Sequence, residues 1–61
     1  MKAISHGPLQ AKDQIEVAIN DFESDDYLVI SVMPRIVVAR NLYTNEVKRI
    51  RIRDILTVFR D

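Results

Sequence analysis

The stretch YLVISVM, residues 27–33, limits the fold of this chain more than any other feature. It is an almost unbroken run of aliphatic and β-branched residues, and Pro34 follows it directly. β-Branched residues favour strands, and a continuous apolar run is typical of a strand buried on both faces. Proline cannot donate a ladder hydrogen bond, so it marks a turn between strands. The sequence therefore predicts a sheet with a doubly buried strand at 27–33.

Three more segments are predicted after this strand. Residues 35–43 (RIVVARNLY) and 47–53 (VKRIRIR) flank Thr-Asn-Glu, which contains a turn-forming asparagine, so they predict a β-hairpin. Residues 54–59 (DILTVF) fit either a last short strand or a short C-terminal helix. The C-terminal half is therefore expected to be mainly antiparallel β.

Residues 11–22, AKDQIEVAINDF, fit either a helix or a first strand. The apolar positions that fit one helical stripe are Ala11, Ile15, Ala18, Ile19 and Phe22. Yet Ile15, Val17 and Ile19 alternate as in a strand. We prefer the helix, because Pro8 suits a first turn and the early acidic residues suit a helix N-terminus. The acidic sequence ESDD, residues 23–26, is predicted to be the turn that follows.

The size of the chain predicts one domain, at 11–61, preceded by a flexible N-terminal arm at 1–10 that contains a Gly-Pro turn signal. A chain of 61 residues buries a modest share of its surface, and without cysteine it has no disulfide to stabilise it. Its hydrophobic content of 48% therefore predicts a homo-oligomer. No signal-peptide pattern or long apolar run is present, so we expect a soluble cytoplasmic protein that does not enter the membrane.

The register of the hairpin follows if Thr44 and Asn45 form its tip. The opposed pairs are then Leu42 with Val47, Arg40 with Arg49, Val38 with Arg51, and Ile36 with Arg53. These eight residues share one face, because side chains alternate along strands. The other face carries the core residues Val37, Ala39, Ile50 and Ile52, with Lys48 near the tip. Opposed like charges destabilise a sheet, so Arg40 and Arg49 are expected to hold an anion between them.

The charges of the chain are unevenly distributed although the net charge is zero. Residues 1–26 hold two basic and six acidic residues, whereas 27–61 hold seven basic and three acidic ones, which gives formal charges of −4 and +4. Such a split is typical of a polyanion-binding face. It also fits halves that neutralise each other, within one chain or across a dimer.

Enzymatic, metal and cofactor chemistry is not expected. A calcium loop starting at Asp21 needs glycine at its sixth position and glutamate at its twelfth, but Asp26 and Val32 stand there. The adjacent Ser5 and His6 cannot supply a nucleophile with a separately held base. One glycine in the chain rules out a glycine-rich phosphate loop.

The succession of short strands that closes with VKRIRIRDILTVF resembles an SH3-like or Sm-like small barrel, over residues 27–59. The resemblance implies an open small barrel around one small core, with an optional helix before the strands. A helix packed on a sheet, an α+β arrangement, also fits.

Two functions are predicted from the hairpin. The first is a small non-enzymatic regulatory protein that binds DNA or RNA through Arg40, Lys48, Arg49, Arg51 and Arg53, since arginine forms bidentate contacts with phosphate. The second is a protein-interaction module, an inhibitor or an assembly subunit. It would meet an acidic partner through the same face, or use the acidic turn at 21–26.

Overall fold

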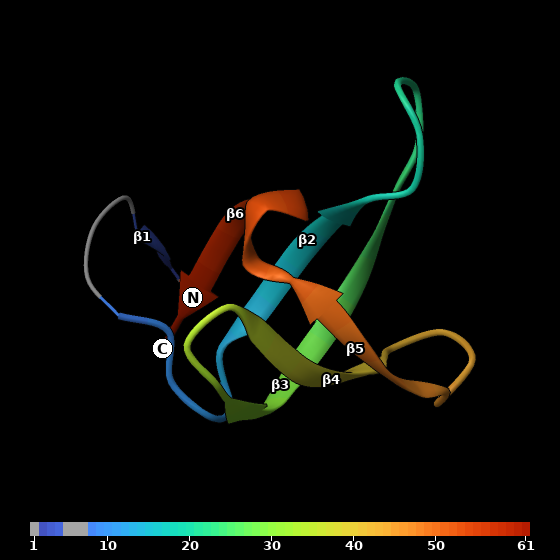
Figure 1. Cartoon of the computed structure of the whole chain (residues 1–61). Helices are drawn as coiled ribbons and strands as arrows, with labels where there is room; N and C mark the ends of the chain where they lie inside the picture. The colour runs from blue at the N-terminus through green and yellow to red at the C-terminus, as the bar shows by residue number, and fades with distance from the viewer. Residues whose placement is uncertain (1, 5–7) are drawn as a thin grey trace.

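Six β-strands and one short 3₁₀ helix make up the fold in the computed structural model, which describes residues 2–4 and 8–61. The elements in chain order are β1 (Lys2–Ile4), β2 (Gln14–Ala18), β3 (Ser24–Val32), β4 (Ile36–Asn41), β5 (Val47–Arg51), η1 (Ile52–Asp54) and β6 (Ile55–Arg60). The strands form one antiparallel sheet in the order β1-β6-β2-β3-β4-β5 (Figure 1). The prediction of a mainly β fold is confirmed.

The sheet is a meander that turns back on itself. Strands β2 to β5 are joined in sequence as neighbours, and η1 then redirects the chain so that β6 pairs with β2. The last strand thus lies beside the first strand of the meander, while β1 and β5 form the two edges. The predicted small antiparallel sheet is therefore an open one.

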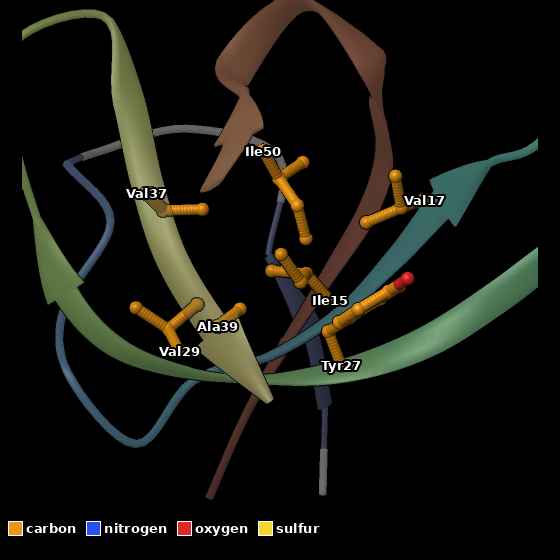
Figure 2. Packing of buried hydrophobic residues seen from close by; sticks show 7 residues of the cluster. All are labelled: Ile15, Val17, Tyr27, Val29, Val37, Ala39 and Ile50. Carbon is orange, nitrogen blue, oxygen red and sulfur yellow. The ribbon is translucent and has the colours of Figure 1, made fainter. Parts of the chain in front are cut away.

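The hydrophobic core lies on one face of this sheet (Figure 2). Its seven buried side chains come from β2, β3, β4 and β5, and they are Ile15, Val17, Tyr27, Val29, Val37, Ala39 and Ile50. They occupy alternate positions along their strands, as the two-residue period of a strand requires. Val37, Ala39 and Ile50 were predicted to form this core side of the hairpin, and that prediction is confirmed.

The helix preferred for residues 11–22 is wrong, because this segment contains strand β2. Ile15 and Val17 both point into the core, at 0% and 7% exposure. β2 pairs with β3 on one side and β6 on the other, so its backbone groups are bonded along both edges. Tertiary pairing and the β-branched alternation outweigh the helical stripe here.

Strand β3 starts earlier than predicted and is buried on one face only. Ser24 to Asp26 belong to β3, so the turn lies at residues 19–23 and not at 23–26. Tyr27 and Val29 are buried, whereas Ile30 and Val32 are 47% and 41% exposed. A bulge between Val29 and Ser31 changes the pairing with β4. Double burial was wrong because the sheet curves around its core on one face, and within the described residues Ile30 and Val32 on the outer face of β3 remain exposed.

The two ends of the chain lie next to each other. Residues 55–60 form β6, so the strand alternative for 54–59 is right and the helix is wrong. Lys2–Ile4 of the predicted arm pair with β6 as β1. Part of that arm, including the Ser5–His6 pair and Gly7, lies outside the described residues. No helix in the described ranges is long and apolar enough to cross a membrane.

A buried ion pair joins the start of β2 to the end of β6. Asp13 is 2% exposed, and its two carboxylate oxygens accept hydrogen bonds from Nε and a terminal nitrogen of Arg60, both at 2.8 Å. The backbone N–H of Gln10 donates a third bond to Asp13 at 2.9 Å. Arg60 also donates to the carbonyl of Pro8 at 3.0 Å. This contact holds residues 8–13 against the last strand.

Candidate nucleic-acid interface

The β4–β5 hairpin carries the predicted basic face, but its register differs from the predicted one. The observed opposed pairs are Ile36 with Arg51, Val37 with Ile50, Val38 with Arg49, Ala39 with Lys48, and Arg40 with Val47. Each partner is shifted by two residues, so the paired side chains of β4 and β5 keep their predicted faces. Arg40 is opposed by Val47, and the predicted pairing of Arg40 with Arg49 is wrong. The anion expected between those two arginines loses its basis.

Asn41 sets this register. It is 3% exposed, and its side-chain oxygen accepts hydrogen bonds from the backbone N–H groups of Tyr43 and Thr44, at 2.8 and 3.0 Å. The N–H of Asn45 then returns to the Asn41 carbonyl, and Asn45 adopts φ = 65°. The loop therefore starts at Asn41 and is wider than a two-residue tip. Asparagine side chains stabilise such turns by bonding the backbone two or three residues on.

Three arginines project from the outer face of the hairpin, opposite the core. They are Arg40 on β4 and Arg49 and Arg51 on β5, and all three are exposed. We call this set the arginine face. Arg49 and Arg51 are two residues apart on one strand, which places their Cα atoms about 6.6 Å apart. The aliphatic residues Ile36, Val38 and Val47 lie across from or beside them.

Arg53 lies outside the hairpin, because β5 ends at Arg51 and Arg53 belongs to η1. It nevertheless remains close to the arginine face. Arg53 and Arg51 line a surface depression of about 440 Å³ together with Ile36 and Arg35. Arg35 follows Pro34 in the β3–β4 turn and was not among the predicted site residues. The only sequence signal for it was its place at the start of the predicted strand, which did not indicate its proximity to Arg53.

Lys48 belongs to the other face of β5, as its position in the sequence predicted. Its ammonium group lies 3.4 Å from the Glu46 carboxylate and 6.0 Å from the centre of the Tyr27 ring. The Tyr27 hydroxyl, followed by Glu46, raises the pKa of Lys48. Lys48 is therefore engaged with its neighbours at the rim of the core and is separated from the arginine face.

The acidic side chains of β2 and β3 are bonded to neutral groups. Glu16 accepts hydrogen bonds from the hydroxyls of Ser24 and Thr57, at 2.8 and 3.2 Å. Asp26 accepts one from the Tyr43 hydroxyl at 2.6 Å, and this bond raises the pKa of Tyr43. Asp25 accepts one from the Asn41 amide at 3.2 Å. The acidic residues of the N-terminal half thus leave the hairpin arginines uncompensated.

The arginines themselves have few partners. In the described ranges, the side chains of Arg35, Arg49 and Arg51 make no hydrogen bond or ion pair with the protein. Arg40 donates one long bond of 3.5 Å to the Asn45 amide oxygen, and Arg53 lies 4.0 Å from Asp54. Apart from Arg60, the arginines are therefore available to an external anion.

Comparisons with known proteins give no relative for this chain. No family model, no curated protein and no solved structure matches it. The function must accordingly be argued from the geometry.

Proposed function

We propose that this protein binds the phosphate backbone of DNA or RNA, without enzymatic activity, through the arginine face and Arg53. The observation that carries the proposal is that three exposed arginines share one sheet face in a chain of zero net charge, while the carboxylates of Glu16, Asp25 and Asp26 on β2 and β3 bond to hydroxyls and an amide. Guanidinium groups bind phosphate oxygens in bidentate fashion. A two-stranded ribbon is also a known element for contact with nucleic acid.

The roles of the predicted residues differ within this proposal. Arg49 and Arg51 contact successive phosphates, because they project from one side of an edge strand. Arg40 extends the contact onto β4, and Arg35 joins the depression beside Arg53 as an additional phosphate ligand. Lys48 contributes long-range attraction only, since it faces Tyr27 and Glu46.

Fluorescence anisotropy with labelled single-stranded DNA, single-stranded RNA and duplex DNA tests this proposal. Each phosphate contact adds about 0.7 to the salt slope for single strands and about 0.9 for duplex DNA. We expect Arg49→Ala/Arg51→Ala to weaken binding for all sequences and to lower the slope by about 1.4 to 1.8. Lys2→Ala, which removes a positive charge on the opposite edge strand, is the control and should leave the slope nearly unchanged.

Two results would contradict the proposal. One is a parent protein that binds none of the three probes at low salt. The other is an equal loss of affinity in Lys2→Ala and Arg49→Ala, which would indicate a general charge effect. In either case the remaining roles for the arginines are the protein contact described next and, for those on β5, protection of an exposed edge strand from pairing with other chains.

A protein partner is the second candidate function, and the aliphatic residues of the arginine face favour it. Val47 is 53% exposed beside Arg40, and Ile36 and Val38 are half-buried on the same surface. An acidic protein with an apolar patch fits such a mixed surface. Its binding would depend on Val38 and Val47 and weaken only modestly with salt, whereas binding to a phosphate backbone falls steeply.

A further inference from the structure

The hairpin between β2 and β3 ends in an ordered acidic tip, residues 19–23. Phe22 is 95% exposed there and Ile19 is 56% exposed. The Asn20 side-chain oxygen accepts hydrogen bonds from the N–H groups of Phe22 and Glu23, at 2.8 and 2.9 Å, and Ile19 N–H donates to the Glu23 carbonyl at 2.9 Å. Figure 1 shows this hairpin projecting beyond the rest of the sheet. The turn therefore presents an aromatic ring to solvent, and the residues before and after it in the sequence, Asp21 and Glu23, are acidic and exposed.

An apolar groove lies at the other end of β3. It has a volume of about 530 Å³ and is lined by Pro8, Leu9, Val32, Met33, Pro34 and Ile52. Val32 and Met33 are 41% and 40% exposed, so the groove is open to solvent. Arg35 and Arg53 follow Pro34 and Ile52 directly in the sequence and are exposed, and they line the separate depression of about 440 Å³ described above. We call this surface the arginine-bordered groove.

The tip and the groove complement each other in both apolar character and charge. The tip offers a phenyl ring whose two sequence neighbours carry carboxylates, and the groove offers an apolar depression whose lining residues Pro34 and Ile52 are each followed in the sequence by an exposed arginine. The ring is large and rigid, which is the kind of side chain that anchors protein interfaces. Charge complementarity at the border of such a contact fixes its orientation.

The two surfaces cannot meet within one molecule. The tip precedes β3 and the groove follows it, and the nine residues of this strand separate them by about 26 Å. Figure 1 places the tip and the β3–β4 turn at opposite ends of the strand. A contact between them must therefore be made by two chains.

We infer that this protein self-associates head to tail, with Phe22 of one copy seated in the arginine-bordered groove of a second copy. Asp21 and Glu23 then pair with Arg35 and Arg53 of that copy. Part of the charge difference between the two halves of the chain is then neutralised between molecules, whereas Asp13 and Arg60 neutralise each other within one molecule. Such a contact uses two different surfaces, so it generates a ring if it closes and a chain of subunits if it does not. The inference does not depend on nucleic-acid binding.

Sedimentation velocity over a concentration series, with no nucleic acid present, tests this inference. We expect the weight-average sedimentation coefficient of the parent protein to rise with concentration. Phe22→Ser should weaken self-association about 30-fold, the effect typical of an interface anchor. The change should leave the fold intact, because the Phe22 side chain is 95% exposed. Leu56→Ser, at a residue 60% exposed elsewhere, is the matched control and should associate like the parent.

Charge reversal identifies the partner surface. Arg35→Glu/Arg53→Glu and Asp21→Arg/Glu23→Arg should each be monomeric alone, and an equimolar mixture should associate again because the reversed charges attract. Three results would overturn the inference: a monomeric parent at every concentration, a Phe22→Ser variant that associates like the parent, or a mixture that stays monomeric. If Phe22→Ser blocks association while Arg35→Glu/Arg53→Glu does not, the contact is tip to tip and the groove is not the partner.

Discussion

Replacing Asp13 by asparagine tests the only buried ion pair among the described residues. Asparagine keeps the size and shape of the side chain but turns one carboxylate oxygen into an NH₂ group. That group faces the donors of Arg60 or the N–H of Gln10, which both bond to the carboxylate in the parent protein. At least one of the three hydrogen bonds to Asp13 is lost, and donor groups are brought face to face.

The cost follows from the burial of Asp13. A hydrogen bond to a charged group contributes about 1.5–3 kcal/mol, and breaking a buried ion pair costs about 3–5 kcal/mol when the remaining charge stays buried. Here the remaining charge is on Arg60, whose side chain is 30% exposed and can be hydrated. We therefore expect a loss near the lower end, about 2–3 kcal/mol. A domain of this size has a stability of roughly 3–9 kcal/mol, so the variant is close to unfolding.

The loss of stability should depend on pH. The hydrogen bonds from Arg60 hold the pKa of Asp13 below its ordinary value of 3.8. A depressed folded-state pKa contributes stability that is fully present above the unfolded value of about 3.9 and is lost as the pH falls through the folded pKa. The difference between parent and variant is therefore largest above about pH 5 and shrinks below pH 4.

Thermal and urea unfolding followed by circular dichroism, from pH 2.5 to pH 7, measure this difference. At pH 7 we expect the Tm of Asp13→Asn to fall by about 10–20 °C. Asp54→Asn is the matched control, because its carboxylate makes only an exposed contact of 4.0 Å with Arg53. It should shift the Tm by no more than a few degrees. A loss in Asp13→Asn that is equal at pH 3 and pH 7 would refute the ion-pair reasoning.

Four other outcomes follow from the described contacts. Val37→Ala removes two methyl groups from a fully buried side chain and should cost about 2 kcal/mol in chemical denaturation. Asn41→Ala should cost about 1–3 kcal/mol, because two loop N–H groups lose their acceptor, and strong amide-exchange changes should be confined to residues 42–46. Asp26→Asn should lower the pKa of Tyr43 toward its ordinary value, as measured by ultraviolet absorbance titration. Arg49→Ala/Arg51→Ala should change the free energy of unfolding by less than about 0.5 kcal/mol, since neither guanidinium has a hydrogen-bond or ion-pair partner among the described residues.

The two strands of the β4–β5 hairpin were predictable because their side chains alternate. Val37, Ala39 and Ile50 occupy alternating positions, and all of them lie in the core. The N-terminal segment was harder, since Ile15 and Ile19 fit both periods. The strand won through contacts with β3 and β6, which are distant in sequence and which no local pattern reveals. Local pattern therefore predicts a strand best where the apolar positions fit the two-residue period of a strand and do not also fit the 3.6-residue period of a helix.

Asp13 was predicted as an early residue of a helix and proved to be a buried partner of Arg60. The two residues are separated by 47 positions, and each is a common surface type. A carboxylate can be buried only when its charge is compensated, so the pairing explains the burial once the fold is known. Nothing in the neighbouring sequence of either residue indicated the partner. Long-range ion pairs of this kind lie beyond a reading of local pattern.

The hairpin shows which detail of a site the hydrophobic pattern leaves undetermined. A register shift of two residues keeps every side chain on its face, so the pattern of Val37, Ala39 and Ile50 fits both registers equally. The choice rests on Asn41, whose buried amide bonds the loop backbone and starts the turn two residues before the position that a short tip requires. That single side chain moves the neighbour of Arg40 from Arg49 to Val47 and removes a repulsion that seemed to demand an anion. The case for anion binding then rests on the absence of carboxylate partners for Arg40, Arg49 and Arg51 among the described residues. That absence follows from where the acidic residues lie in the fold, which the sequence pattern does not reveal.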